Sequence, residues 1–180
     1  MKIHDQRSTE MQRLADRLHG QRTAMVTLRE ISGRLGSRPL TPLEMDSHGA
    51  LWMLVSKKSM APLFTHGEMP ANVAFSDESK SLFVSIAGTA RLVDDMARKV
   101  ALWTAMARPW FSGADDPDLT LLCITPDEAE VWDGPESSVV RVLAMAASVA
   151  AAKPIGLGEH EVVIPPVAVP PVSIPHSQPA

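Results

Sequence analysis

Four basic side chains and one serine stand at the ends of two predicted strands, and they are the residues best suited to binding chemistry. They are Arg34, Arg38, Lys57, Lys58 and Ser59. Arginine offers a two-pronged donor and lysine a point charge, so such a group suits a phosphate. This interpretation requires the two strands, Gly36–Thr41 and Leu51–Ser56, to be neighbours. Solvated strand ends without a ligand are the alternative.

An aromatic pair, Trp110 and Phe111, lies in a loop rich in turn-forming residues. Large aromatic side chains in loops commonly cover the edge of a core or a subunit contact. Beside a basic pocket, the same pair would suit a flat phosphorylated ligand. Both interpretations stay open at the level of the sequence.

The common enzyme and metal signatures do not occur. The sequence has no GxGxxG, P-loop or HExxH string, no Ser-His-Asp order, and no two histidines four residues apart. Asp115, Asp116 and Asp118 lack the glycine and distal glutamate of a calcium loop, so they are interpreted as turn and capping residues, with cation binding as the alternative. Cys123 stands alone in an apolar run and is predicted to be a buried thiol.

The composition is typical of a globular domain. The chain has 180 residues, 45% of them hydrophobic, a net charge of −4, and no apolar run near the roughly 18 residues of a membrane helix. The negative charge argues against nucleic-acid binding, because phosphate contacts require a basic face. The charged start, MKIHDQRSTE, does not resemble a secretory signal, so we expect a cytoplasmic location and no membrane partner.

The first half of the chain predicts one helix and then strands. Ser8 can cap a helix that Gly20 closes. Strands are predicted at Thr23–Glu30, Gly36–Thr41 and Leu51–Ser56. The last of these is apolar on both faces and is therefore expected to be central. Pro39 and Pro42 restrict the strand before it to an edge or a bulge.

The second half predicts further strands and two helices. A short helix or turn is expected at 59–69, followed by strands at Ala71–Ser76 and Ser81–Val93 that a loop at 77–80 joins. A helix is then expected from Asp94 or Asp95 to about Ala107, with Met96, Val100 and Trp103 along one stripe. After it we expect a hairpin of Leu119–Thr125 and Glu128–Trp132, and a last helix at Ser138–Ala152. Gly88 indicates a bulge or a close backbone approach.

The predicted domain organisation is one domain over 1–153 and a proline-rich tail over 154–180. Proline pairs favour extended polyproline II without ladder bonds, and docking of the tail on a partner subunit is the alternative. Strands that follow one another favour an antiparallel barrel or sheet over alternating βαβ units. The fold class is therefore mainly β with flanking helices.

Several strings of this sequence resemble one known family. They are TAMVTL (Thr23–Leu28), SRPL (Ser37–Leu40), LWMLVSKKS (Leu51–Ser59), FVSIAGTARLVDD (Phe83–Asp95) and WFSGADDPDLTLLCITPDEAEVWD (Trp110–Asp133). In this order they resemble the general stress protein branch of the pyridoxamine 5′-phosphate oxidase-like, FMN-binding split barrels. The last string is the most specific, because a long irregular string is hard to match by composition alone.

The resemblance implies a six-stranded antiparallel split β-barrel that forms a homodimer, with FMN as the small-molecule ligand at the subunit interface. It places Arg38, Pro39 and Leu40 beside the flavin, the backbone of Leu54 and Val55 at its ring edge, Ser59 at the phosphate with Lys57 and Lys58 near it, and Trp110 near the cleft. No residue is assigned a catalytic role.

Three positions depart from the family pattern. Members commonly carry Thr where this chain has Val55 and Lys where it has Ala61, and the oxidase relatives carry Arg where it has Met60. A charge-assisted contact to a phosphate contributes about 1.5–3 kcal/mol, so one or two fewer would weaken binding about ten- to a thousandfold unless the basic group compensates.

Two functions are consistent with the sequence. The first is an FMN-binding protein that can act as an FMN-dependent oxidoreductase, with the flavin providing the chemistry. The second is a flavin-free split-barrel dimer that binds another ligand or serves as a stress-associated interaction module. The departures at Val55, Met60 and Ala61 motivate the second, because they make the cleft less polar and less cationic.

Overall fold

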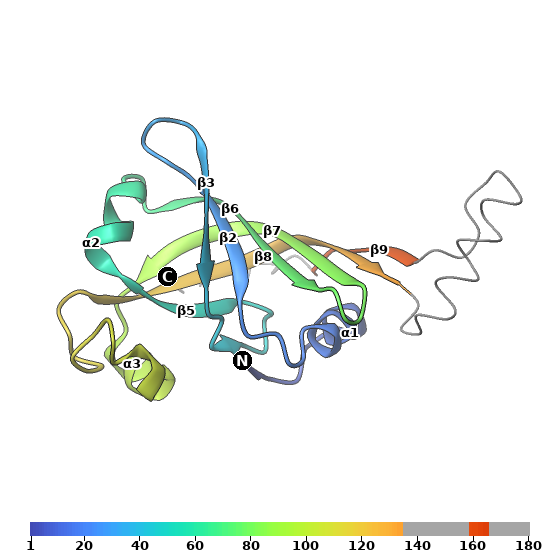
Figure 1. Cartoon of the computed structure of the whole chain (residues 1–180), viewed down its shortest axis with the longest axis horizontal. Helices are drawn as coiled ribbons and strands as arrows, with labels where there is room; N and C mark the ends of the chain where they lie inside the picture. Colours follow the sequence, from blue (N-terminus) through green and yellow to red (C-terminus); the bar gives the residue numbers. More distant parts are fainter. Residues whose placement is uncertain (135–158, 166–180) are drawn as a thin grey trace, which may run out of the picture.

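The protein folds into a single curled sheet with a few short helices (Figure 1). The structure, a computed structural model, describes residues 1–134 and 159–165. Its described strands are β1 (Lys2–Ile3), β2 (Ala24–Arg29), β3 (Leu35–Leu40), β4 (Glu44–Met45), β5 (Leu51–Ser56), β6 (Glu68–Asp77), β7 (Leu82–Val93), β8 (Leu119–Asp133) and β9 (Glu159–Val163). The described helices are α1 (Thr9–Arg17), α2 (Lys57–Met60) and α3 (Met96–Leu102), with 3-10 turns η1 (Ala61–Leu63) and η2 (Ala105–Ala107).

The sheet follows the order β1-β4-β5-β8-β7-β6-β2-β3, and β9 pairs with β8 beside this path. Every described pairing is antiparallel except that of β1 with β4. The predicted mainly β class is confirmed. The hydrogen-bonded path is open at β1 and β3, and a mixed sheet of nine described strands does not confirm the six-stranded antiparallel count.

One apolar core fills the concave side of the curled sheet. It gathers fully buried side chains from helix α1 and from five strands, namely Leu14, Val26, Met53, Val73, Ile86 and Ile124. Burial of each such side chain contributes about 1.5–3 kcal/mol relative to exposure. The sheet curls because the inward-facing residues of distant strands share this interior.

Helix α1 closes one end of that core, and its predicted boundaries are confirmed. The Ser8 hydroxyl accepts a hydrogen bond from the Met11 backbone N–H at 3.2 Å, which caps the first turn. Gly20 has a φ of +83°, a left-handed conformation that favours glycine after the last turn. Leu14 and Leu18 face the core and are fully buried.

Strand β5 is central and buried on both faces, as the sequence predicts. Leu51, Met53 and Val55 belong to the main core, whereas Trp52 and Cys123 belong to a second apolar cluster on the opposite face. Helix α3 adds Leu102 to this second cluster. Helix α3 therefore covers a small second core on this face of β5 and β8.

The predicted hairpin of Leu119–Thr125 and Glu128–Trp132 is wrong, because β8 runs without a turn from Leu119 to Asp133. Its pairing with β7 shifts register where Ala87 faces Glu128 and Gly88 faces Pro126, so one extra residue bulges from β8. Pro126 has no backbone N–H to donate to the ladder, which suits a bulge. The sequence signal of a turn is therefore a β-bulge, and the close approach predicted at Gly88 is confirmed.

The predicted helix from Asp95 to Ala107 is interrupted. Asp95 caps α3 by accepting from the Arg98 backbone N–H at 3.0 Å, as expected, but Trp103 has an extended ψ of 131° and ends the helix. The predicted apolar stripe is also wrong in direction, because Met96 and Val100 are exposed at 50% and 60%.

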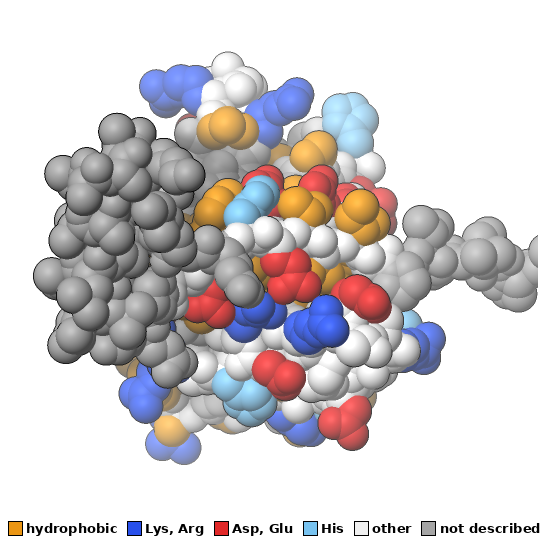
Figure 2. All heavy atoms as spheres, turned by 90° about the vertical axis from the view of Figure 1, so that its right-hand side faces the viewer, with side chains coloured by type: hydrophobic (Ala, Val, Ile, Leu, Met, Phe, Trp, Pro, Cys, Tyr) orange, Lys and Arg blue, Asp and Glu red, His pale blue; other side chains and the backbone are white. Residues whose placement is uncertain are grey.

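Strand β9 lies within the predicted tail and pairs with β8, so the expectation of no ladder bonds is wrong for Glu159–Val163. Val163 is buried, and Arg17 of α1 pairs with Glu161 at 3.1 Å. Figure 2 views this end of the molecule and shows acidic and basic side chains interleaved over the described surface. The helix predicted at 138–152 lies outside the described residues.

Among residues 1–134 and 159–165, no helix is both long and apolar enough to cross a membrane. 

Replacing Gly88 by alanine should destabilise the fold by about 1–3 kcal/mol, because the added Cβ would collide with the Thr125 carbonyl across the bulge. Urea denaturation of wild type and Gly88→Ala measures this difference. Ala87→Ser, at the exposed neighbouring position, is the control and should change stability by less than about 0.5 kcal/mol. Equal stability of Gly88→Ala and wild type would show that the bulge relaxes freely.

Candidate functional site

Strand β3 positions the first group of predicted site residues at the edge of the sheet. In the register with β2, Arg38 faces Val26, Pro39 faces Met25 and Leu40 faces Ala24. β3 ends the strand order, which confirms that the proline-limited strand is an edge strand. Arg38 and Leu40 are half-buried, whereas Pro39 is exposed.

The end of β5 and the start of α2 position the second group. The Ser56 hydroxyl accepts from the Ser59 backbone N–H at 3.3 Å and caps α2. Leu54 is half-buried against the smaller apolar cluster, and Val55 is buried in the main core. The side chain of Val55 therefore faces the core rather than a cleft.

Strands β3 and β5 are not neighbours, so the condition for convergence of the basic group is wrong as stated. Four strands, β8, β7, β6 and β2, separate them in the sheet order. The Arg38 side chain nevertheless reaches α2, where its Nη1 lies 3.7 Å from the sulfur of Met60. The curl of the sheet thus brings the two strand ends together without pairing them.

Arg38 is not an isolated cation. Its Nη2 lies 3.8 Å from Glu30 Oε1, and Nη2 of Arg34 lies 3.9 Å from Glu30 Oε2. The carboxylate is thus shared by two guanidinium groups. Both distances are longer than a hydrogen bond, so the attraction is a Coulomb one between partly solvated charges.

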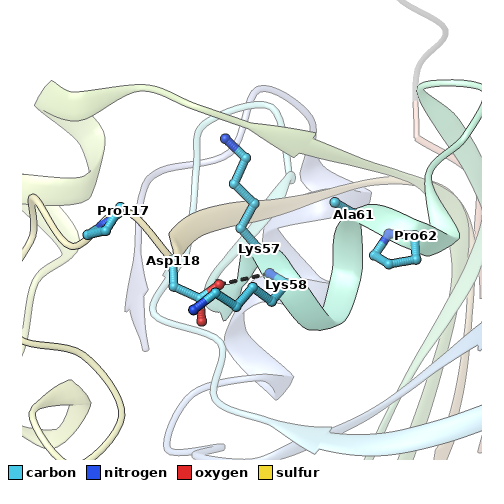
Figure 3. A pocket seen from close by; sticks show the side chains of 6 residues that line it. All are labelled: Lys57, Lys58, Ala61, Pro62, Pro117 and Asp118. Atoms are coloured by element: carbon cyan, nitrogen blue, oxygen red, sulfur yellow. Dashed lines mark hydrogen bonds between the residues drawn. The ribbon is translucent and has the colours of Figure 1, made fainter.

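Asp118, just before β8, binds the first turn of α2. Its Oδ1 accepts from the Lys58 backbone N–H at 2.8 Å, its Oδ2 accepts from the Ser56 hydroxyl at 2.8 Å, and its carbonyl accepts from the Lys57 backbone N–H at 2.6 Å (Figure 3). The Lys58 N–H is the main reason why the pKa of Asp118 lies below its usual value, with help from the Ser56 hydroxyl and the Lys58 charge. The donors at this helix start are therefore already satisfied.

An open cavity of about 360 Å³ lies beside this turn (Figure 3). Its described lining consists of Lys57, Lys58, Ala61, Pro62, Pro117 and Asp118. Two of the predicted site residues, Lys57 and Lys58, line it. The other seven, including Arg38, Ser59 and Trp110, are not among its described lining residues.

Lys57 is further held by Asp94, whose Oδ2 lies 3.8 Å from the ammonium group. Oδ1 of the same carboxylate lies 2.5 Å from Nζ of Lys99, a side chain that is only 6% exposed. The hydrogen bond from Lys99, with its charge, holds the pKa of Asp94 below the usual value. Asp94 thus ties the cavity to helix α3.

The remaining candidates divide into exposed and buried groups. Trp110 is 75% exposed in the turn after η2, and Ser59 is exposed on α2. Cys123 is buried, as predicted, and burial raises the pKa of its thiol. Within the described part of the chain, no three His, Cys, Asp or Glu side chains gather as metal ligands. Asp116 accepts from the Ser112 and Asp118 backbone N–H groups, which fits the predicted turn role.

The chain belongs to the pyridoxamine 5′-phosphate oxidase-like family, whose model matches residues 9–154. Among curated proteins it is similar to general stress protein 26 of Bacillus subtilis strain 168, with 31% identity over 58 residues. That match covers 32% of this chain and 41% of the relative, so the aligned part spans less than half of the relative's length.

Solved structures extend this likeness over most of the chain. The general stress FMN/FAD binding protein of Xanthomonas citri is 31% identical with a TM-score of 0.60, covering 73% of this chain and 93% of that one. A protein described as a general stress protein 26 from Jannaschia sp. CCS1 is 28% identical with a TM-score of 0.64, covering 83% and 94%.

Sequence reasoning did not assign Glu30, Asp94 or Asp118 to the site. Asp118 was expected to cap a turn before its own strand, and its cap is instead on α2, 60 positions away from Lys58. The local sequence already offers Ser56 as the cap of α2, so it does not signal a need for a second, distant cap. Nothing local points to Asp118 as that cap.

Replacing Asp118 by asparagine should destabilise the fold at neutral pH and have little effect in acid. A folded-state pKa below the unfolded value stabilises the fold above the unfolded value and loses that contribution as pH falls through the folded one. Urea denaturation at pH 7 and below about pH 4 should show the difference shrinking. Asp115→Asn, at an exposed carboxylate three positions earlier, is the control. A difference that persists unchanged in acid would contradict this account.

Proposed function

We propose that this protein binds FMN, as a homodimeric split barrel related to the general stress proteins. The observation that carries the proposal is the contact of Arg38 with Met60 of α2, at 3.7 Å. It shows a guanidinium from the edge strand β3 beside α2, the helix that follows the interior strand β5. Support also comes from the family match and from the Xanthomonas citri relative, which is named as an FMN/FAD binding protein.

The phosphate end of FMN fits the charges present. Arg34 and Arg38 share a single carboxylate, so one positive charge is left without a partner in this group. Lys57 and Lys58 line the cavity beside α2. A phosphate held by one guanidinium with a two-pronged contact needs no further lysine at position 61. Arg38 is therefore the proposed phosphate-binding residue, and Ser59, Lys57 and Lys58 of α2, the helix that Arg38 contacts through Met60, are proposed to complete the site.

The flavin ring needs more surface than one chain offers. A cavity of about 360 Å³ lies at the low end of ligand pockets. Pro39, Leu40 and Leu54 would supply the apolar side of the ring site, with backbone groups of Leu54 and Val55 at its edge. Trp110, exposed at 75%, would cover the ring of the same or the partner site. A partner subunit would complete the cleft, which is why the proposal includes a homodimer.

Any oxidoreductase activity would rest on the cofactor. Bound FMN supplies electron or hydride transfer, and the protein contributes position and electrostatic tuning. No described residue beside the proposed site is assigned a role as general acid or base. The chain's own residues would bind the phosphate, orient the ring and exclude water.

A flavin-free dimer is the second candidate, and one observation favours it. Val55 and Met60 point into the main core, and Asp118 places a carboxylate in the cavity beside Lys58. A cavity with both signs of charge would also accept a neutral or zwitterionic ligand. This candidate shares the fold and the dimer with the first and differs in its ligand.

Purified protein should quench FMN fluorescence on titration, and Arg38→Gln should weaken FMN binding about ten- to a hundredfold through loss of a charge-assisted contact. Riboflavin, which lacks the phosphate, should bind both proteins about equally. Arg22→Gln, at an exposed arginine after α1, is the matched control and should leave FMN affinity unchanged. Absence of FMN binding to wild-type protein would favour the flavin-free candidate.

Light scattering should give twice the 19.5 kDa mass of one chain. If FMN is held between subunits, saturating FMN should also lower the protein concentration at which dimers dissociate, by mass action. A concentration series with and without FMN measures both effects. A monomer at micromolar concentration, with or without FMN, would overturn the dimer part of the proposal.

A further inference from the structure

The carboxylate of Glu30 lies between the two arginines of strand β3's hairpin. It follows β2, and its backbone is fixed by the hairpin, because its N–H donates to the Arg34 carbonyl at 2.7 Å and its carbonyl accepts from the Gly33 N–H at 2.8 Å. From there the side chain reaches Arg38 at 3.8 Å and Arg34 at 3.9 Å. The negative charge that pairs with Arg38, the proposed phosphate-binding residue, is thus the side chain of Glu30 in the same protein.

Gly36 makes this placement possible. A Cβ on Gly36 would collide with Glu30 Oε1, so the carboxylate rests directly against the bare backbone of β3. Gly36 and Arg38 are two positions apart and share one face of the strand. Because Gly36 has no side chain, the carboxylate can lie against β3 on the same face as the guanidinium of Arg38 and close to it.

The contact has the properties of a pair that a ligand can displace. Both oxygen–nitrogen distances exceed hydrogen-bond length, and the side chains of Arg38 and Glu30 are 29% and 36% exposed. Exposed pairs of this kind contribute about 0.2–1 kcal/mol. A phosphate carries more negative charge and can accept two hydrogen bonds from the same guanidinium, so it would displace the Glu30 carboxylate.

We propose that Glu30 is an internal competitor for the anion site at Arg38, and that Gly36 exists to admit it. The ligand class is a phosphate monoester or another compact dianion. Glu30 shares its negative charge between Arg38 and Arg34 when no ligand is bound and must leave Arg38 when one binds, so it lowers the affinity of the site. This rests on the proposed FMN function for its natural ligand, but the competition itself concerns any anion at Arg38.

Two independent substitutions should remove the competitor. Glu30→Gln keeps the size of the side chain and removes its charge. Gly36→Ala keeps the charge and forces the carboxylate to shift, because the added Cβ needs the space that Oε1 occupies and Gly36 does not have a positive φ. Each should bind FMN up to about fivefold more tightly than wild type, the fold-change that corresponds to loss of such a pair, with riboflavin affinity unchanged. Glu78→Gln, in the turn between β6 and β7, controls for net charge.

The test is titration of full-length wild type and the three variants with FMN, riboflavin and, by thermal shift, inorganic pyrophosphate. Tighter FMN and stronger pyrophosphate stabilisation in Glu30→Gln and Gly36→Ala, but not Glu78→Gln, would support the inference. FMN binding that is equal in all four proteins would overturn it and leave the proposed function intact. A pyrophosphate gain without FMN binding in any protein would support the competitor and refute FMN. No gain for any anion would overturn the competitor.

Discussion

The curl of a single sheet is the constraint on which the candidate site depends. The open path of strands runs from β1 to β3, and the first group of basic residues lies at one end of it while the second follows β5. Only because the sheet bends around a shared apolar interior can Arg38 touch α2. The core is therefore the part of the structure that assembles the site, since its inward-facing side chains fix the curvature.

Carboxylates accompany the cations throughout this region. Glu30 lies beside Arg38, Asp94 beside Lys57, and Asp118 at the start of α2. Such pairing reduces the repulsion among the positive side chains in the free protein, and it also weakens the binding of an added anion. In the proposed site, ligand binding would therefore require rearrangement of these charge pairs rather than occupation of an empty cationic pocket.

Much of the fold could be predicted from local pattern, because caps, apolar alternation and turn residues act over a few positions. The Ser8 cap, the edge position of β3 and the two-faced burial of β5 follow from such signals. The local sequence at Pro126 and Asp127 could not distinguish a turn from a bulge, because both use the same residue types. Only the pairing with the facing strand decides between them. The neighbours of β3 and the capping role of Asp118 also depend on long-range topology, which spacing along the chain does not encode.

The departures from the family pattern have a structural consequence at two of the three positions. Val55 and Met60 are buried in the same apolar cluster, 4% and 3% exposed, where they join β5 and α2 to the core. An arginine at position 60 in this conformation would bury an unpaired charge, which costs several kcal/mol unless α2 turns. Met60 instead offers its sulfur to the guanidinium of Arg38. In the proposed site the cation beside α2 is therefore Arg38 of β3, which the curvature of the sheet brings to Met60.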